Sequence, residues 1–193
     1  KPIRAPYLVN SPDFVACHVP SYLDKYDMLK GLKKGGIFLL NSIWSVEETL
    51  NHLPNSTKKY LATNNISFYI INATAIAEEL GLGNRTNTIM QSAFFKVSNV
   101  IPYDIAVAEM KKAIVKSYGK KGEKVVSMNN AAVDRGGDVT KVNVDPSWSN
   151  LPCTEKEKHN DIPAFIRDVV EPMNAQEGDN LPVSAFLGRE DGT

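Results

Sequence analysis

Apolar residues in the first half of this chain gather in short uninterrupted runs, separated by stretches in which they recur at helical spacing. A continuous apolar run of about four to eight residues is typical of a strand that is buried on both faces. Three such runs stand out, at 13–17 (DFVAC), 37–41 (IFLLN) and 66–72 (ISFYIIN). A fourth, shorter run covers 5–10 (APYLVN), between the start of the chain and a Ser-Pro pair.

Helical spacing fills the intervals between these runs. We expect a helix over 21–33, with Ser21 at its start and Gly35-Gly36 as its C-cap and turn. These glycines precede a strand, which argues against a phosphate loop. The segment 45–53 opens with a capping box, Ser45 and Glu48. Further helices are expected over 57–65, over 73–81, from 87 onward, over 103–119, over 123–137 and, near the end of the chain, over about 163–173.

Alternating strands and helices predict an α/β fold: a three-layer arrangement with a mostly parallel sheet and helices on both faces. Each parallel pair needs a crossover, which should be right-handed. After residue 145 the chain becomes polar and proline-rich, without a sustained period. We therefore expect one domain over 1–145 and a connector over 146–193 that packs along it or leads to a next module.

Composition and charge argue against several classes of function. The chain has 22 basic and 22 acidic residues among its 193, so no global field draws it to nucleic acid or to an anionic membrane. No apolar run reaches the roughly 18 residues of a membrane span, and the first residues lack the apolar core of a signal peptide. Two distant cysteines suit a reducing compartment, so we expect a cytoplasmic protein. The chain starts without a methionine, and we expect a fragment of something larger.

Cys17 and His18 are adjacent, which raises the question of a nucleophile with its base, or of a metal site. Neighbouring residues of a strand point to opposite faces, so the two cannot pair within one. We interpret Cys17 as a small buried apolar residue. His18 stands at a strand end that can face a ligand, although a loop or capping role is the stronger interpretation. Only three histidines exist, without ligand-like spacing, so no metal site is expected.

Ligands of parallel sheets bind at the carboxyl ends of the strands. Asn10, Asn41 and Asn72 each follow an apolar run, which indicates either turn chemistry or a polar rim over the sheet. The cluster 120–124 (KKGEK) is typical of a solvated helix start, or alternatively of a docking patch for an acidic partner.

The stretch 81–91 (GLGNRTNTIMQ) is the most suggestive one, because two glycines and an arginine stand just before a helix. Arg85 can hold a phosphate or carboxylate with its planar guanidinium, and a helix start favours anions. The alternative is an ion pair of Arg85 with a carboxylate, with Asn87 or Thr88 as the N-cap. The residues supply no complete active site, so no catalytic residue is assigned.

Long phrases of the chain resemble the pyruvate:ferredoxin (flavodoxin) oxidoreductases. The resemblance covers essentially the whole chain. It lies in 13–42 (DFVACHVPSYLDKYDMLKGLKKGGIFLLNS), in GLGNRTNTIMQSAFFK, in KSYGKKGEKVVSMNNAAVD and in LPVSAF near the end. It implies that 1–145 is the central gamma-type domain, a Rossmann-like domain whose first strand and loop are missing here. It also implies that 146–193 leads towards a segment with a Glu-Lys-Arg motif.

The resemblance implies a function for the whole enzyme. A long chain, usually a homodimer, oxidises pyruvate with coenzyme A to acetyl-CoA and CO2. Thiamine diphosphate with Mg2+ carries out the carbon chemistry, and [4Fe–4S] clusters pass the electrons to ferredoxin or flavodoxin. These cofactors are held by the remaining domains of the same chain. This fragment is then expected to be inactive alone and to bind no metal or cofactor by itself.

The family's Arg-x-Asn phrase corresponds here to Arg85-Thr86-Asn87. By resemblance, Arg85 and Asn87 are expected to contact coenzyme A. Two other functions stay open: a purely structural module that bridges other domains, and a stand-alone nucleotide-binding α/β domain.

Overall fold

A computed structural model describes residues 9–153 and 161–188, and within them four strands form one sheet in the order β1-β2-β3-β4. The strands β1 (Phe14–Cys17), β2 (Ile37–Asn41) and β3 (Ser67–Ile71) are parallel, and β4 (Thr140–Val142) pairs antiparallel with β3. The three predicted buried strands and the mostly parallel sheet are confirmed. Most of the apolar run over 5–10 lies outside the described residues.

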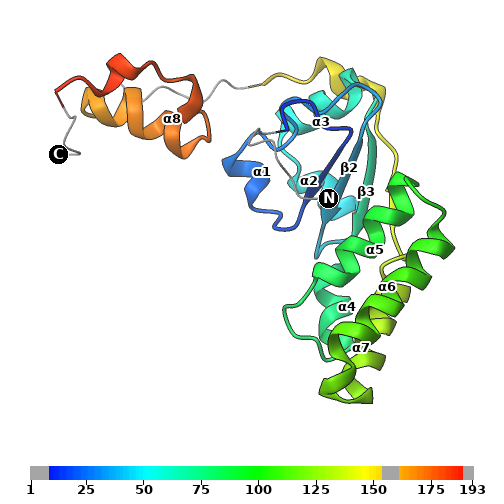
Figure 1. Cartoon of the computed structure of the whole chain (residues 1–193). Coiled ribbons are helices and arrows are strands. Elements are labelled where there is room, and N and C mark those ends of the chain that lie inside the picture. The colour runs from blue at the N-terminus through cyan, green and yellow to red at the C-terminus, as the bar shows by residue number, and fades with distance from the viewer. Residues whose placement is uncertain (1–8, 154–160, 189–193) are drawn as a thin grey trace.

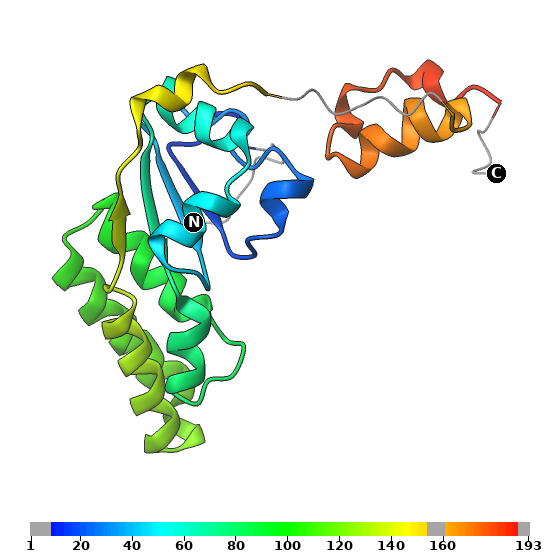
Figure 2. The same cartoon turned by 180° about the vertical axis from the view of Figure 1, so that it is seen from behind.

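Helices cover both faces of this sheet (Figure 1, Figure 2), which confirms the three-layer fold. One face carries α1 (Tyr22–Lys25), α2 (Val46–His52) and α3 (Asn55–Thr63). The other face carries α4 (Ala73–Glu79), α5 (Asn87–Ser98), α6 (Tyr103–Tyr118) and α7 (Glu123–Arg135). A short 3-10 turn, η1 (Gly119–Lys121), joins α6 to α7.

The two hydrophobic cores explain why the strands are continuously apolar. Phe38 and Leu40 of β2 pack into the core under α1–α3, where Phe38 stacks on Phe68 of β3 with ring centroids 5.4 Å apart. Leu39, between them, packs into the opposite core under α4, α5 and α7. Since successive side chains of a strand point to opposite faces, a sheet covered on both sides needs an apolar residue at each position.

The helix expected over 21–33 is wrong in its length, because α1 ends at Lys25. Tyr26 adopts an extended backbone (φ −125°, ψ 149°), and the Ser21 side chain makes no capping hydrogen bond. Leu29 and Leu32 still reach the core, but from turns. Gly35-Gly36 accordingly form a turn into β2 and not a helix C-cap, with Gly35 at a φ of +76°.

Two further outcomes concern the second half of the chain. The strand β4 was not predicted, because it has only three residues and only Val142 is buried. The helix expected near 163–173 is confirmed as a helical stretch that contains η3 (Ile166–Val170), a π-helical turn, and α8 (Glu171–Asn174). Shorter 3-10 turns are η2 (Pro146–Asn150), η4 (Gly178–Asn180) and η5 (Val183–Phe186).

One buried amide joins three parts of the fold. Asn41, the last residue of β2, is 4% exposed. Its Nδ2 donates to the His18 carbonyl at 3.1 Å and to Thr74 Oγ1 at 3.1 Å, and its Oδ1 accepts from the Ala73 backbone N–H at 2.9 Å. The residue after β1 and the first turn of α4 are thus both held by the end of β2.

Replacing Asn41 with leucine should destabilise the protein strongly. The variant keeps the approximate volume but leaves the His18 carbonyl and the Ala73 N–H without their partner, which should lower the free energy of unfolding by about 2–4 kcal/mol. Urea denaturation followed by circular dichroism measures this. Asn51→Ala, at an exposed position of α2, is the control and should change stability by less than about 0.5 kcal/mol. Equal losses in both variants would contradict this role of Asn41.

The capping box predicted at the start of α2 is confirmed, and it should make stability depend on pH. Ser45 Oγ accepts from the Glu48 N–H at 3.2 Å, and Glu48 Oε2 accepts from the Ser45 N–H at 3.0 Å. The hydrogen bonds from the Ser45 side chain and backbone lower the pKa of Glu48 below its ordinary value of 4.5. A carboxyl whose pKa is lowered by folding stabilises the fold above its unfolded pKa, and this stabilisation fades as the pH falls through the folded pKa.

Glu48→Gln should therefore unfold at a lower temperature than the parent at neutral pH, and the gap should close in acid below the folded pKa. Thermal unfolding at several pH values measures it. Glu47→Gln removes a neighbouring charge outside the box and serves as the control. A gap that stays constant across the pH range would show that the Glu48 carboxylate does not act through its ionisation.

Candidate functional site

The structure separates Cys17 from His18, as strand geometry predicts. Cys17 is fully buried, its Sγ donates to the Val19 carbonyl at 3.1 Å, and burial raises the pKa of its thiol. A raised pKa disfavours the thiolate, which is the reactive form. His18 is exposed, and only its backbone carbonyl takes part in the Asn41 network. The pair is therefore no nucleophile and base.

The asparagines at the strand ends stabilise the fold and form no ligand-facing rim. Asn72 is the N-cap of α4: its Oδ1 accepts from the Ala75 N–H at 2.9 Å, and its Nδ2 donates to the Ile43 carbonyl at 3.4 Å. Asn41 is buried in the network described above. Asn10 is exposed and follows no strand of the described residues. Of the two interpretations, turn and cap chemistry holds for Asn72.

The segment between α4 and α5 is a well-anchored loop. Gly81 adopts a left-handed φ of +71°, and the Leu82 N–H donates to the Ala77 carbonyl at 2.8 Å while the Gly81 N–H donates to the Glu78 carbonyl at 3.0 Å. This pair of bonds is the Schellman motif, which ends α4. Leu82, 5% exposed, packs into the core below α4. The backbone next to Arg85 is thereby fixed.

Arg85 and Asn87 stand on the exposed side of this loop. Arg85 donates its backbone N–H to the Leu82 carbonyl at 3.3 Å, and its guanidinium makes no ion pair with any described residue. Glu79, a carboxylate at the end of α4, is instead paired with Arg135 at 3.0 Å. The expected alternative, Arg85 paired with a carboxylate, is not what the structure shows.

The N-cap of α5 is Thr86, and not Asn87 or Thr88 as expected, and Asn87 is the first helical residue. The Thr86 side chain makes no capping hydrogen bond. In α4, by contrast, the amides of Asn41 and Asn72 accept from N–H groups of the first turn. The start of α5, like the starts of α3, α6 and α7, thus lacks a side-chain acceptor, and unsatisfied N–H groups and the helix dipole favour anions there.

The part of the chain that the structure describes contains no cluster of potential metal ligands. No group of three or more His, Cys, Asp or Glu residues in 9–153 and 161–188 lies close enough together to hold an ion. The two cysteines are a buried one and an exposed one. Across the same residues, no helix has both the length and the apolar character that a membrane crossing requires.

The chain is similar to known proteins over its whole length. The family model described as "Pyruvate ferredoxin/flavodoxin oxidoreductase" matches residues 1–139, and a model named EKR, a domain of unknown function, matches residues 154–193. The pyruvate-flavodoxin oxidoreductase of Enterobacter agglomerans is 52% identical over all 193 residues. The pyruvate:ferredoxin oxidoreductase of Moorella thermoacetica is 48% identical over 187 residues, 96% of this chain. The chain spans only 16% of the length of each of these two relatives.

A solved structure shares the fold. The pyruvate oxidoreductase subunit PORC from Thermotoga maritima superposes with a TM-score of 0.55 over 70% of this chain and 67% of its own, at 24% sequence identity. That similarity supports the α/β architecture, while the family model, which matches well over half of the chain, decides the relationship. On this evidence the chain belongs to the pyruvate ferredoxin/flavodoxin oxidoreductase family.

Proposed function

We propose that this chain is the gamma-type domain, over 1–145, and the following connector, over 146–193, of a long oxidoreductase. That enzyme oxidatively decarboxylates pyruvate with coenzyme A to acetyl-CoA and CO2, and passes the two electrons to ferredoxin or flavodoxin. The observation that carries this proposal is the 52% identity over the whole chain to an enzyme named for pyruvate and flavodoxin. We take the enzyme to be a cytoplasmic homodimer, as the resemblance implies.

The domain is proposed to be inactive alone, because its cysteines are too few to hold the iron–sulfur clusters of such a reaction. A [4Fe–4S] cluster needs about four thiolate ligands, and the chain has two cysteines, of which Cys17 is sealed in the core. Thiamine diphosphate with Mg2+ and the clusters then reside in the remaining domains of the same chain. The contribution of this domain is to pack against those domains and to contact coenzyme A.

The contact with coenzyme A is proposed at Arg85 and Asn87. Arg85 is exposed, has no carboxylate partner among the described residues, and stands on a loop that Leu82 and the Schellman bonds hold in place. A guanidinium offers two parallel N–H donors to a phosphate, and such charge-assisted bonds are strong. Asn87 adds a side-chain amide at the uncapped start of α5. Together they suit one phosphate group of coenzyme A.

In the intact oxidoreductase that contains this chain, Arg85→Ala should raise the KM for coenzyme A roughly tenfold, because a charge-assisted hydrogen bond is lost. Steady-state kinetics with varied coenzyme A measures this, and the KM for pyruvate should not change. The KM of Arg85→Lys for coenzyme A should lie between those of the parent and Arg85→Ala, since lysine keeps the positive charge but lacks the two parallel N–H donors of the guanidinium. Gln91→Ala, one turn further along α5 and also exposed, is the matched control.

An unchanged KM for coenzyme A in Arg85→Ala would remove Arg85 from the site. The domain would then act as the structural module that bridges other parts of the enzyme. No observation favours the stand-alone nucleotide-binding alternative, since the chain corresponds to about one sixth of each of the two relatives described above.

A further inference from the structure

Helix α6 exposes large apolar side chains on the face that it turns away from the domain. Its inner face buries Met110 and Ile114 against Val133 of α7. On the outer face, Ile105 is 51% exposed and Val115 is 54% exposed. A surface helix keeps its solvent face polar when nothing covers it, so this outer face suits a contact with another protein surface.

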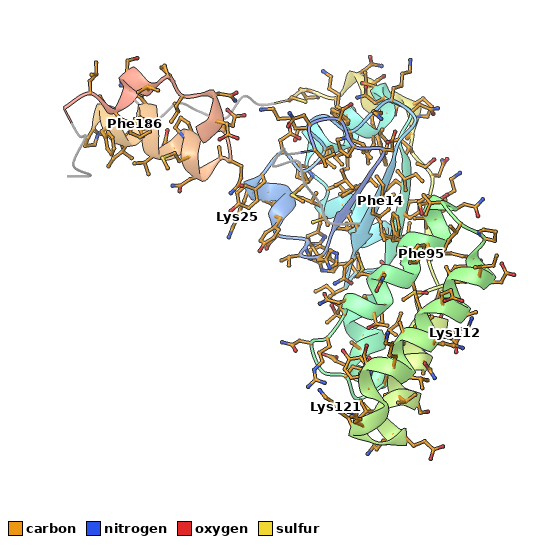
Figure 3. The ribbon with its side chains drawn as sticks, viewed as in Figure 1. Phe14, Lys25, Phe95, Lys112, Lys121 and Phe186 are labelled. Carbon is orange, nitrogen blue, oxygen red and sulfur yellow. The ribbon has the colours of Figure 1, made fainter. Side chains whose placement is uncertain are left out.

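The exposed residues of α6 follow the spacing of a contact between two helices. Four exposed residues are separated by three, four and three positions: Ile105, Ala108, Lys112 and Val115. Residues at this spacing lie along one line of a helix and pack against a second helix. Lys112, the polar member of the line, points into solvent (Figure 3), and its methylene groups can cover apolar surface while its ammonium stays in water. We name these four residues the outer stripe.

The charges of α6 are sorted along the helix. Its first half, 103–110, carries two acidic residues and no basic one, namely Asp104 and Glu109. Its second half, 111–118, carries three lysines and no acidic residue, namely Lys111, Lys112 and Lys116. An antiparallel second copy of α6 therefore places the acidic half of each helix beside the basic half of the other, whereas a parallel copy places like halves together.

The outer stripe is also self-complementary in its apolar residues. Ile105 and Val115 lie five positions before and five positions after residue 110. A two-fold axis at this level brings Ile105 of each copy onto Val115 of the other. Contacts in which one residue meets a second, and the second meets the first, are those of a symmetric dimer.

We propose that the outer stripe of α6 pairs with the outer stripe of a second copy of this chain, antiparallel and about a two-fold axis. This inference rests on the proposed function and deepens it, because it assigns one part of the subunit interface of the proposed homodimer. A single pair of 16-residue helices covers less than the roughly 1,600 Å² of a standard interface, so other domains of the enzyme contribute the rest.

The test places cysteines at both ends of the outer stripe in the intact oxidoreductase, as the double variant I105C/V115C. Within one helix, ten residues rise about 15 Å, far more than the roughly 4.4–6.8 Å between the Cα atoms of a disulfide. A disulfide between these two positions therefore joins two chains. After anaerobic oxidation with diamide, non-reducing electrophoresis should show most of the chain at twice its mass. Peptide mass spectrometry should find position 105 linked to position 115.

Each single variant, I105C or V115C, should give little cross-linked chain, because the two copies of one position lie about 15 Å apart in this register. The double variant E47C/E78C puts exposed cysteines on α2 and α4, which cover opposite faces of the sheet, and should also stay uncross-linked. An uncross-linked I105C/V115C, or controls that cross-link as strongly, would overturn the inference.

A charge reversal tests the choice of a second copy as the occupant. In the I105C/V115C background, D104K/E109K makes both halves of α6 basic and should lower the cross-linked fraction about threefold or more. Added salt should restore part of it, since exposed charges are screened. E47K/E78K reverses the same number of exposed charges away from α6 and should leave cross-linking unchanged. Cross-linking that D104K/E109K does not lower would contradict the antiparallel pairing.

The outcomes separate this inference from the proposed function. A parent enzyme that sediments as a monomer would remove both the homodimer and the role of α6. A dimeric parent whose I105C/V115C variant stays uncross-linked would remove only the role of α6. Slow maleimide labelling of those cysteines would then show that another domain of the same chain covers the outer stripe. Neither result changes the expected effect of Arg85→Ala on coenzyme A.

Discussion

The buried amide of Asn41 is the constraint on which the arrangement of this domain depends. A polar group away from water must find its hydrogen bonds inside the protein, and each of these bonds fixes a neighbour. Here the neighbours are the His18 carbonyl after β1 and the first turn of α4. Because α4 is held at its start, its far end and the loop with Arg85 are placed as well. A core interaction thereby determines where the exposed arginine stands.

Much of the fold could be predicted from the sequence because its signals are local. The buried strands follow from uninterrupted apolar runs, and the capping box of α2 follows from Ser45 and Glu48. The errors arose where tertiary packing outweighs local pattern. Leu29 and Leu32 have helical spacing but reach the core from turns, and β4 is set by its pairing with β3 and not by its own three residues.

For the candidate site too, the features set by local sequence could be predicted and those set by tertiary packing could not. Arg85 and Asn87 could be selected from the sequence, because glycines, an arginine and a helix start are adjacent there. The burial of Cys17 could also be predicted, since it continues an apolar run. The contact of that loop with α7 could not, because it brings Gly81 next to Met128, 47 residues further along the chain. The burial of Asn41 could not be predicted either, since the sequence of an asparagine after a strand is the same whether its side chain faces solvent or the core.

The helices that follow β2 and β3 leave the sheet towards opposite faces, α2 on one side and α4 on the other. Two adjacent parallel strands with this property form a topological switch point, where open α/β sheets commonly open a crevice for a ligand. In this domain the Asn41 side chain occupies that place, and its amide oxygen accepts from the start of α4 as a bound anion would. A hydrogen bond within the protein therefore already satisfies the N–H donor of Ala73 that a ligand at the switch point would otherwise use.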